Sequence, residues 1–304
     1  MERIMDGNGM RRGLVAVLLL VSAATANAQK VEYVYVTKAI SYLQTSATDV
    51  VVDPAPPSPG YGGPYWFWAD VEGQNLESIA PPTFSGPVNP AISGWYNGGV
   101  LKYNQRDEKW RAGRPGNDFG APTFDNLNSN FGNGTYSFSL LATGVSLSLA
   151  GDLYGNTPKF TLTGGTWSGG IYVIDVAKPL TLTTNAYAGY GTHVDDFITA
   201  WLEGGPSEVR LHSRDGGSNV VTLDVPAFTM VSGRTYRAGA AFGAISDEKA
   251  IAGLDGALAF ASYNNELFFT ISAVPELSTL FQSLLGTALL GGWLGRQRAR
   301  SRSR

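Results

Sequence analysis

Few side chains in this sequence have the chemistry of a nucleophile or of a soft metal ligand. There is no Cys, which excludes a thiol nucleophile, a cysteine-ligated zinc and a disulfide framework. Only two His occur, His193 and His212, and no Gly-x-Ser-x-Gly segment presents an activated serine. A Ser-His-Asp triad would need one of these His beside such a serine. The sequence therefore favours a protein that is not an enzyme, and it predicts no catalytic residue.

Carboxylates are the remaining candidates for acid–base chemistry. His193 and Asp195 share a face if their segment is extended, which fits a metal corner or a solvated polar edge. Asp195 and Asp196 are adjacent, so on a strand they point to opposite faces and cannot form the facing pair of a glycosidase. Any such pair would come from distant segments. A secreted carbohydrate-active enzyme that uses two carboxylates is therefore the alternative function.

The segment from Asn117 to Asn130 is rich in the oxygen ligands that calcium prefers. Only two of them, Asp118 and Asp125, are carboxylates, and their spacing differs from that of an EF-hand loop. Asn and Asp also stabilise turns by bonding to their own backbone. We therefore predict no cofactor, with calcium as the alternative.

Aromatic residues are the most suggestive binding groups. In the run from Tyr65 to Trp68, Trp66 and Trp68 fall on one face of an extended strand and Tyr65 and Phe67 on the other. One face is expected to be core, and an exposed pair of Trp rings stacks well on sugar rings. We therefore consider Trp66 and Trp68 as a possible sugar-stacking site; the alternative is that both faces are covered.

The elements that position these groups are expected to be strands. Between Gln29 and Ala273, no long helical period occurs, and many short runs rich in Val, Ile, Thr, Tyr and Phe are bounded by Gly, Pro, Asn and Asp. Two runs alternate cleanly, with Tyr136, Phe138 and Leu140 on one face of the first and Val145, Leu147 and Leu149 on one face of the second. Such strands bury one side and leave the other in water, so the predicted fold class is all-β.

The predicted organisation is two β-sandwiches, residues 29–151 and 152–273, separated at the Gly/Asn/Pro-rich segment that starts at Ala150. A Pro-initiated strand followed by a Gly turn and a Tyr-bearing strand occurs in both halves, from Pro122 to Tyr136 and from Pro226 to Tyr236. The run from Phe131 to Phe138 resembles a strand of the tandem immunoglobulin-like sandwiches of exported bacterial proteins. That resemblance implies two tandem sandwiches; one large jelly roll is the alternative.

Residues 1–28 have the pattern of a secretory signal peptide. Arg11 and Arg12 precede a short apolar run from Gly13 to Val21, which is too short for a permanent membrane anchor. Ala26 and Ala28 supply the small residues of a cleavage site, so Gln29 is the predicted mature start. Export through the Sec translocon is the expected route.

Residues 274–304 form a second targeting segment in three parts. Val274, Pro275 and Glu276 come first, an apolar stretch from Leu280 to Leu294 follows, and five Arg close the chain. The stretch predicts a short transmembrane helix whose Arg cluster stays cytoplasmic, because it has no polar face of the kind an amphipathic surface helix needs.

This tail resembles the PEP-CTERM sorting signal of Gram-negative bacteria, although Leu277 stands where the family has its second Pro. The resemblance implies an exosortase partner that removes the tail, an inner-membrane-anchored intermediate, and release to the cell surface or beyond. It also implies an association with exopolysaccharide.

The charge of the predicted mature segment argues against nucleic acid as a partner. The whole chain carries 22 Lys and Arg against 25 Asp and Glu, and the two ends hold eight of the Arg and three of the acids, which leaves a net charge of −8. Phosphate backbones require clustered cations instead. The sequence therefore predicts an exported, non-catalytic surface or matrix protein associated with exopolysaccharide or biofilm.

Overall fold

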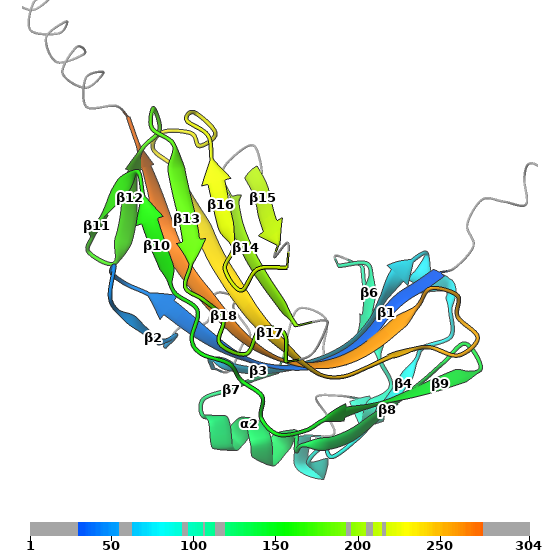
Figure 1. Ribbon diagram of the computed structural model, residues 1–304. Coiled ribbons are helices and arrows are strands. Elements are labelled where there is room, and N and C mark those ends of the chain that lie inside the picture. Colours follow the sequence, from blue (N-terminus) through cyan, green and yellow to red (C-terminus); the bar gives the residue numbers. More distant parts are fainter. Residues whose placement is uncertain are drawn as a thin grey trace, which may run out of the picture.

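The computed structural model in Figure 1 describes residues 30–54, 63–92, 97–105, 107–112, 119–192, 196–204, 209–214 and 217–275. Strands dominate this part of the chain, so the all-β class is confirmed. The only α-helix in the described residues is α2, Phe124–Asn130. Three short 3-10 turns accompany it: η1 (Leu76–Ser78), η2 (Pro90–Ile92) and η3 (Asn97–Gly99).

One large sheet of twelve strands runs through the molecule, and its main path has the order β15-β14-β17-β18-β1-β3-β6-β5. Its two central strands, β1 and β18, are parallel neighbours although they lie at opposite ends of the described chain. The strands of this sheet are β1 (Lys30–Gln44), β2 (Val50–Val52), β3 (Tyr65–Gln74), β5 (Lys102–Asn104), β6 (Lys109–Arg111), β7 (Phe119–Ala121), β11 (Gly165–Ser168), β12 (Ile171–Asp175), β14 (Phe197–Gly204), β15 (Val209–Arg214), β17 (Thr235–Ala250) and β18 (Leu258–Val274).

Two small sheets of three strands each pack on the same face of the large sheet, one near each end (Figure 1). Alternate residues of β18 show this arrangement, because Ala261 and Tyr263 contact the first small sheet's core and Leu267 and Phe269 contact the second. The first small sheet consists of β4 (Thr83–Ser85), β8 (Gly134–Leu140) and β9 (Thr143–Leu149), and the second of β10 (Phe160–Thr163), β13 (Leu180–Thr184) and β16 (Thr222–Val225).

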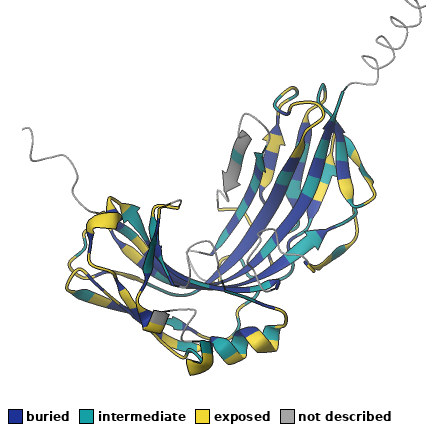
Figure 2. Cartoon of the chain, turned by 180° about the vertical axis from the view of Figure 1, so that it is seen from behind, coloured by how far each residue is buried: buried dark blue, intermediate teal, exposed yellow. Residues whose placement is uncertain are grey.

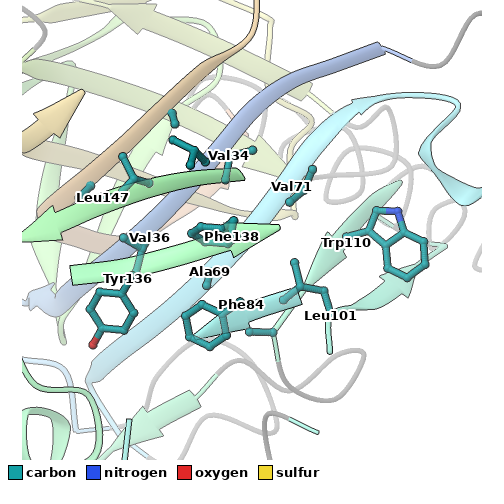
Figure 3. Packing of buried hydrophobic residues seen from close by; sticks show 14 of the residues in the cluster. Val34, Val36, Ala69, Val71, Phe84, Leu101, Trp110, Tyr136, Phe138 and Leu147 are labelled. Carbon is teal, nitrogen blue, oxygen red and sulfur yellow. The ribbon is translucent and has the colours of Figure 1, made fainter. Parts of the chain in front are cut away.

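Each small sheet encloses a separate hydrophobic core, which we call the first core and the second core. In the first core, long-strand residues face the side chains of β8 and β9, as Figure 3 shows for Val36, Ala69, Phe138 and Leu147. Burial follows the long strands, whereas exposed residues gather in loops and on α2 (Figure 2). The alternation predicted from the sequence is confirmed, because the apolar positions of β8 and β9 are buried.

Two local predictions differ from the structure. The sequence has two separate strand-like runs, 257–261 and 267–272, but they form one strand, β18, since the polar residues between them pair with β1 and β17. The oxygen-rich segment was expected as a loop, but its second half is helix α2, where the Thr123 side chain caps the N–H of Asn126 and Leu127 is fully buried.

The predicted boundary near residue 152 lies between β9 and β10, where the chain passes from one small sheet to the other. The two halves nevertheless share the large sheet, because β1 of the first half pairs with β18 of the second and with β3 of its own half. This sharing was not foreseen by the sequence analysis.

The predicted targeting segments lie almost entirely outside the described residues, including Ala26, Ala28, Gln29 and Glu276. Val274 is the last residue of β18 and pairs with Asp175, and Pro275 follows it. Within the described part of the chain, no helix is both long and apolar enough to cross a bilayer.

The first core gives a direct test of the fold. Phe67 is fully buried and stacks on Phe131 with ring centroids 3.8 Å apart. Replacing Phe67 by Ala should lower the free energy of unfolding by about 3–5 kcal/mol in urea titration, because the removed ring leaves a cavity. Phe228 is 75% exposed, so Phe228→Ala is the control and should change this free energy by less than about 0.5 kcal/mol. Equal losses in the two variants would contradict the packing described.

Candidate functional site: the second face of the large sheet

The face of the large sheet opposite the two small sheets is called here the second face. The strand registers place specific residues side by side on it, since partners in neighbouring strands point the same way. Trp66, Ala39, Asn264, Gly243 and Phe197 form one row across five strands. The row beside it contains Trp68, Thr37 and Ser262.

The structure places Trp66 and Trp68 together on this face, with ring centroids 6.2 Å apart in an edge-to-face arrangement. Phe67 lies in the first core on the other face, as the alternation predicts. Trp68 is half-buried, whereas Trp66 is only 6% exposed. Trp68 is therefore the more accessible of the two rings, and the full exposure that a Trp66–Trp68 stacking pair would need is not observed.

Small and polar side chains occupy the middle of the second face. The hydroxyls of Thr37 and Ser262 form a hydrogen bond at 2.8 Å. Asn264 is 8% exposed, and its Oδ1 accepts no hydrogen bond within the described structure. Buried amide oxygens are normally satisfied, so this atom is a buried, unsatisfied acceptor beside the small residues Ala39 and Gly243.

A second aromatic pair lies toward the other end of the face. The rings of Trp201 and Phe268 pack edge to face with their centroids 5.8 Å apart. The Arg237 guanidinium lies 3.9 Å from the Phe268 ring centroid. Between their strands is Gly239, where a Cβ would come 2.5 Å from the Trp201 ring. A glycine here lets the indole lie flat against β17. The sequence analysis missed this pair because strand neighbours of distant origin leave no local spacing signal.

A network of charges closes the end of the second face beside β6. The Asp70 side chain is fully buried and accepts hydrogen bonds from both Arg111 Nε and Nη2, the latter at 2.9 Å. Lys109 Nζ lies 2.9 Å from Asp70 and 2.7 Å from Glu72. The Tyr35 hydroxyl donates to Asp70 at 3.0 Å and also contacts Glu72. Each of these charged side chains thus has an oppositely charged partner within the network.

The pKa values of the network follow from burial and charge. Burial and the neighbouring carboxylates raise the pKa of the Tyr35 hydroxyl well above its usual value, so it remains a donor at neutral pH. Burial alone would lower the pKa of Lys109, but the attraction of Asp70 and Glu72 outweighs it and the pKa is raised. This end of the face is therefore a fixed ion-pair cluster and not a set of groups poised for proton transfer.

Carboxylates of different segments also meet in a cavity of about 350 Å³ between the two cores. Asp152 and Asp196 line it together with Tyr154, Tyr187 and Thr192. Both acids already accept hydrogen bonds, Asp196 from the Ile245 N–H and Asp152 from the Asn133 amide. Burial raises the pKa of Tyr187 to about 12. Among the described residues, this cavity is a place where the two-carboxylate alternative could operate.

Other candidates from the sequence are not brought together. His193 and Asp195 lie outside the described residues, and Asp196 is in the cavity just mentioned. No group of three or more His, Asp or Glu suited to a metal occurs among the described side chains. Two of the residues considered for calcium have other places in the structure. Asp125 lies in the first turn of α2, and Asn126 takes part in the cap of that helix.

The ion-pair network has a measurable contribution to stability. Asp70→Asn should reduce the free energy of unfolding by about 3–5 kcal/mol, because it leaves Arg111 and Lys109 partly buried without their shared carboxylate. Glu203 pairs with Arg237 at 3.7 Å and is 45% exposed, so Glu203→Gln is the matched control, with an expected change below about 1 kcal/mol. Chemical denaturation measures both, and a mild effect of Asp70→Asn would show that water replaces the carboxylate.

No family model matches this chain, and no curated protein matches it.

Proposed function

We propose that this chain is an exported, non-catalytic protein of the bacterial surface or extracellular matrix that binds exopolysaccharide on the second face. The observation that carries the binding proposal is the pair of aromatic clusters, Trp66–Trp68 and Trp201–Phe268, with small polar side chains between them. Flat apolar rings bind the apolar faces of sugars, and a few polar groups orient them. The half-buried Trp68 and Trp201 are the expected contact residues.

The proposed route to the surface rests on the two ends of the sequence. The signal peptide would direct the chain to the Sec translocon, and the tail would hold it in the inner membrane until an exosortase cleaves near Pro275 and Glu276. Within the all-β fold, tandem immunoglobulin-like sandwiches account for the two separate cores. The jelly-roll alternative accounts for the strands that the two halves share.

The competing proposal is a secreted carbohydrate-active enzyme. It is favoured by one observation, the cavity that contains both Asp152 and Asp196. Each of these acids already accepts a hydrogen bond from this chain, Asp152 from Asn133 and Asp196 from Ile245. We therefore prefer the non-catalytic function.

Binding is tested with purified protein and exopolysaccharide from the source organism. Trp68→Ala and Trp201→Ala should each weaken co-sedimentation about tenfold, which is about 1.4 kcal/mol, by removing a stacking surface. Trp167 is a half-buried ring that packs against the second core, so Trp167→Ala is the control and should bind normally.

Circular dichroism of each variant separates lost binding from lost folding. Wild-type protein that does not co-sediment, or variants that remain folded and bind like the wild type, would contradict the binding proposal. Release of reducing ends by the wild type, abolished in Asp152→Asn and Asp196→Asn, would support the enzyme instead.

Localisation is tested by mass spectrometry of the protein released from cells. The mature N-terminus is expected at Gln29, and peptides from Leu280 to Arg304 are expected to be absent. A chain that starts at Met1 or Met10, or released protein that retains the Arg-rich end, would contradict the sorting route.

A further inference from the structure

Lys38 is a fully buried lysine between the two cores. It lies on β1, on the face covered by the small sheets, where the preceding alternate positions are the apolar Val34 and Val36. Its Nζ donates to the side-chain oxygens of Asn128 and Asn133, each at 2.8 Å. Within the described residues, no carboxylate forms an ion pair with it. A buried ammonium with only neutral hydrogen-bond acceptors is unusual, because desolvation of the charge is then only partly offset.

This burial makes the amine a nucleophile near neutral pH. It lowers the pKa of Lys38 to about 8, against the smaller opposing effect of the Asp152 charge. At pH 7 about a tenth of the side chain is then the neutral amine, which has a free electron pair on Nζ. The acceptor atoms beside it belong to carboxamides, whose carbonyl carbons are electrophiles.

The side-chain amide of Asn133 has neighbours that could activate its carbonyl carbon as an electrophile. Its Oδ1 accepts from Lys38 and from the Tyr263 hydroxyl, the latter at 2.9 Å. Its Nδ2 donates to Asp152 Oδ1, also at 2.9 Å. These partners fix the orientation of the amide, since a lysine only donates and a carboxylate accepts. The other neighbour of Lys38, Asn128, lies on α2 and has no such carboxylate bond among the described contacts.

The backbone also supports the position of Asp152. This residue has a φ of 47° and follows Gly151, whose φ is 87°. A non-glycine residue in the left-handed region is uncommon and carries strain, which often occurs where a side chain must be held in a particular place. The turn after β9 thus brings the carboxylate to the Asn133 amide.

We propose that Lys38 and Asn133 form an intramolecular isopeptide bond. The chain itself supplies the nucleophile, the electrophile, an acid–base group and a donor to the carbonyl oxygen. The site is a covalent modification site that depends neither on a ligand nor on the proposed polysaccharide binding.

The reaction needs no oxidant and no co-reactant. The neutral Nζ attacks Cγ of Asn133, and the Tyr263 hydroxyl stabilises the negative charge that develops on Oδ1. Asp152 takes a proton from Nζ and delivers it to Nδ2. The Cγ–Nδ2 bond then breaks, ammonia leaves, and an amide joins Nζ to Cγ.

Such a bond would close the first core covalently. It would join β1 to the turn before β8, which are 95 residues apart in the chain. Disulfides do this in many exported proteins, and this chain has no Cys. An amide between the buried Lys38 and the exposed Asn133 serves the same purpose and withstands reduction.

The test is peptide mapping of the folded, full-length protein after trypsin digestion. Trypsin does not cut after an acylated lysine, so the expected product is a branched peptide that joins the Lys38 segment to the Asn133 segment, with fragment ions that locate the link. Intact mass is insufficient, because a succinimide at Asn133–Gly134 also loses one ammonia. A wild-type digest with free Lys38 and intact Asn133 would overturn the proposal, and so would a succinimide or a link to Asn128.

Variants test the assigned roles. Lys38→Met and Asn133→Ala should abolish the branched peptide, and Asp152→Asn should reduce its yield at least tenfold in protein that circular dichroism shows to be folded. Asn128→Ala is the matched control, since it removes the other hydrogen bond to Lys38 and should leave the link in place. Unchanged cross-linking in folded Asp152→Asn would contradict the proton-transfer role. Because the wild-type digest decides whether the bond exists, a variant that does not fold leaves the proposal testable.

Discussion

The parallel pairing of β1 with β18 is the contact on which the rest of the fold depends. It brings the first described strand beside the last, from the pair Tyr33–Leu258 to the pair Leu43–Phe268. Both cores pack against the resulting sheet surface, and without it neither core would be covered on that side. Because the partners are separated by most of the chain, this pairing is entropically slow to form.

The covered face of these strands changes character halfway along. Apolar residues line it at both ends, but Lys38, Tyr263 and Asn265 interrupt it in the middle. Each has polar partners outside the large sheet: Asn265 donates to the carbonyl of Gly155, on the segment between the two small sheets, and Tyr263 donates to Asn133, just before β8. The polar belt thus separates the two cores and attaches the linker between them to the large sheet. On this view the molecule is two cores on one support.

How much of this could be read from sequence depends on whether the signal is local. The inward positions of β8 and β9 were predictable because alternation is a local property, and the same holds for Phe67. The continuity of β18 was not, because two adjacent Asn are also a turn signal and only their partners on β1 and β17 decide between the two outcomes. Helix α2 had a capping signal in Thr123 and Asn126, but the many Asn around it made the segment resemble a loop.

The Asp70–Arg111 pair and the Trp201–Phe268 contact depend on the register between strands far apart in sequence, which no local pattern indicates. Lys38 did leave a signal: a lone charge on an otherwise apolar strand face.

The place where β18 ends has a mechanical consequence. Val274 is still paired with Asp175, and along its length β18 is bonded on one edge to β17 and on the other to β1 and then β12. A pull applied at Pro275 would therefore act along a strand that is held on both edges, and its hydrogen bonds would have to break together in shear instead of one after another. A chain held at its C-terminal end and attached elsewhere to a polymer network would resist extension through its most central strand.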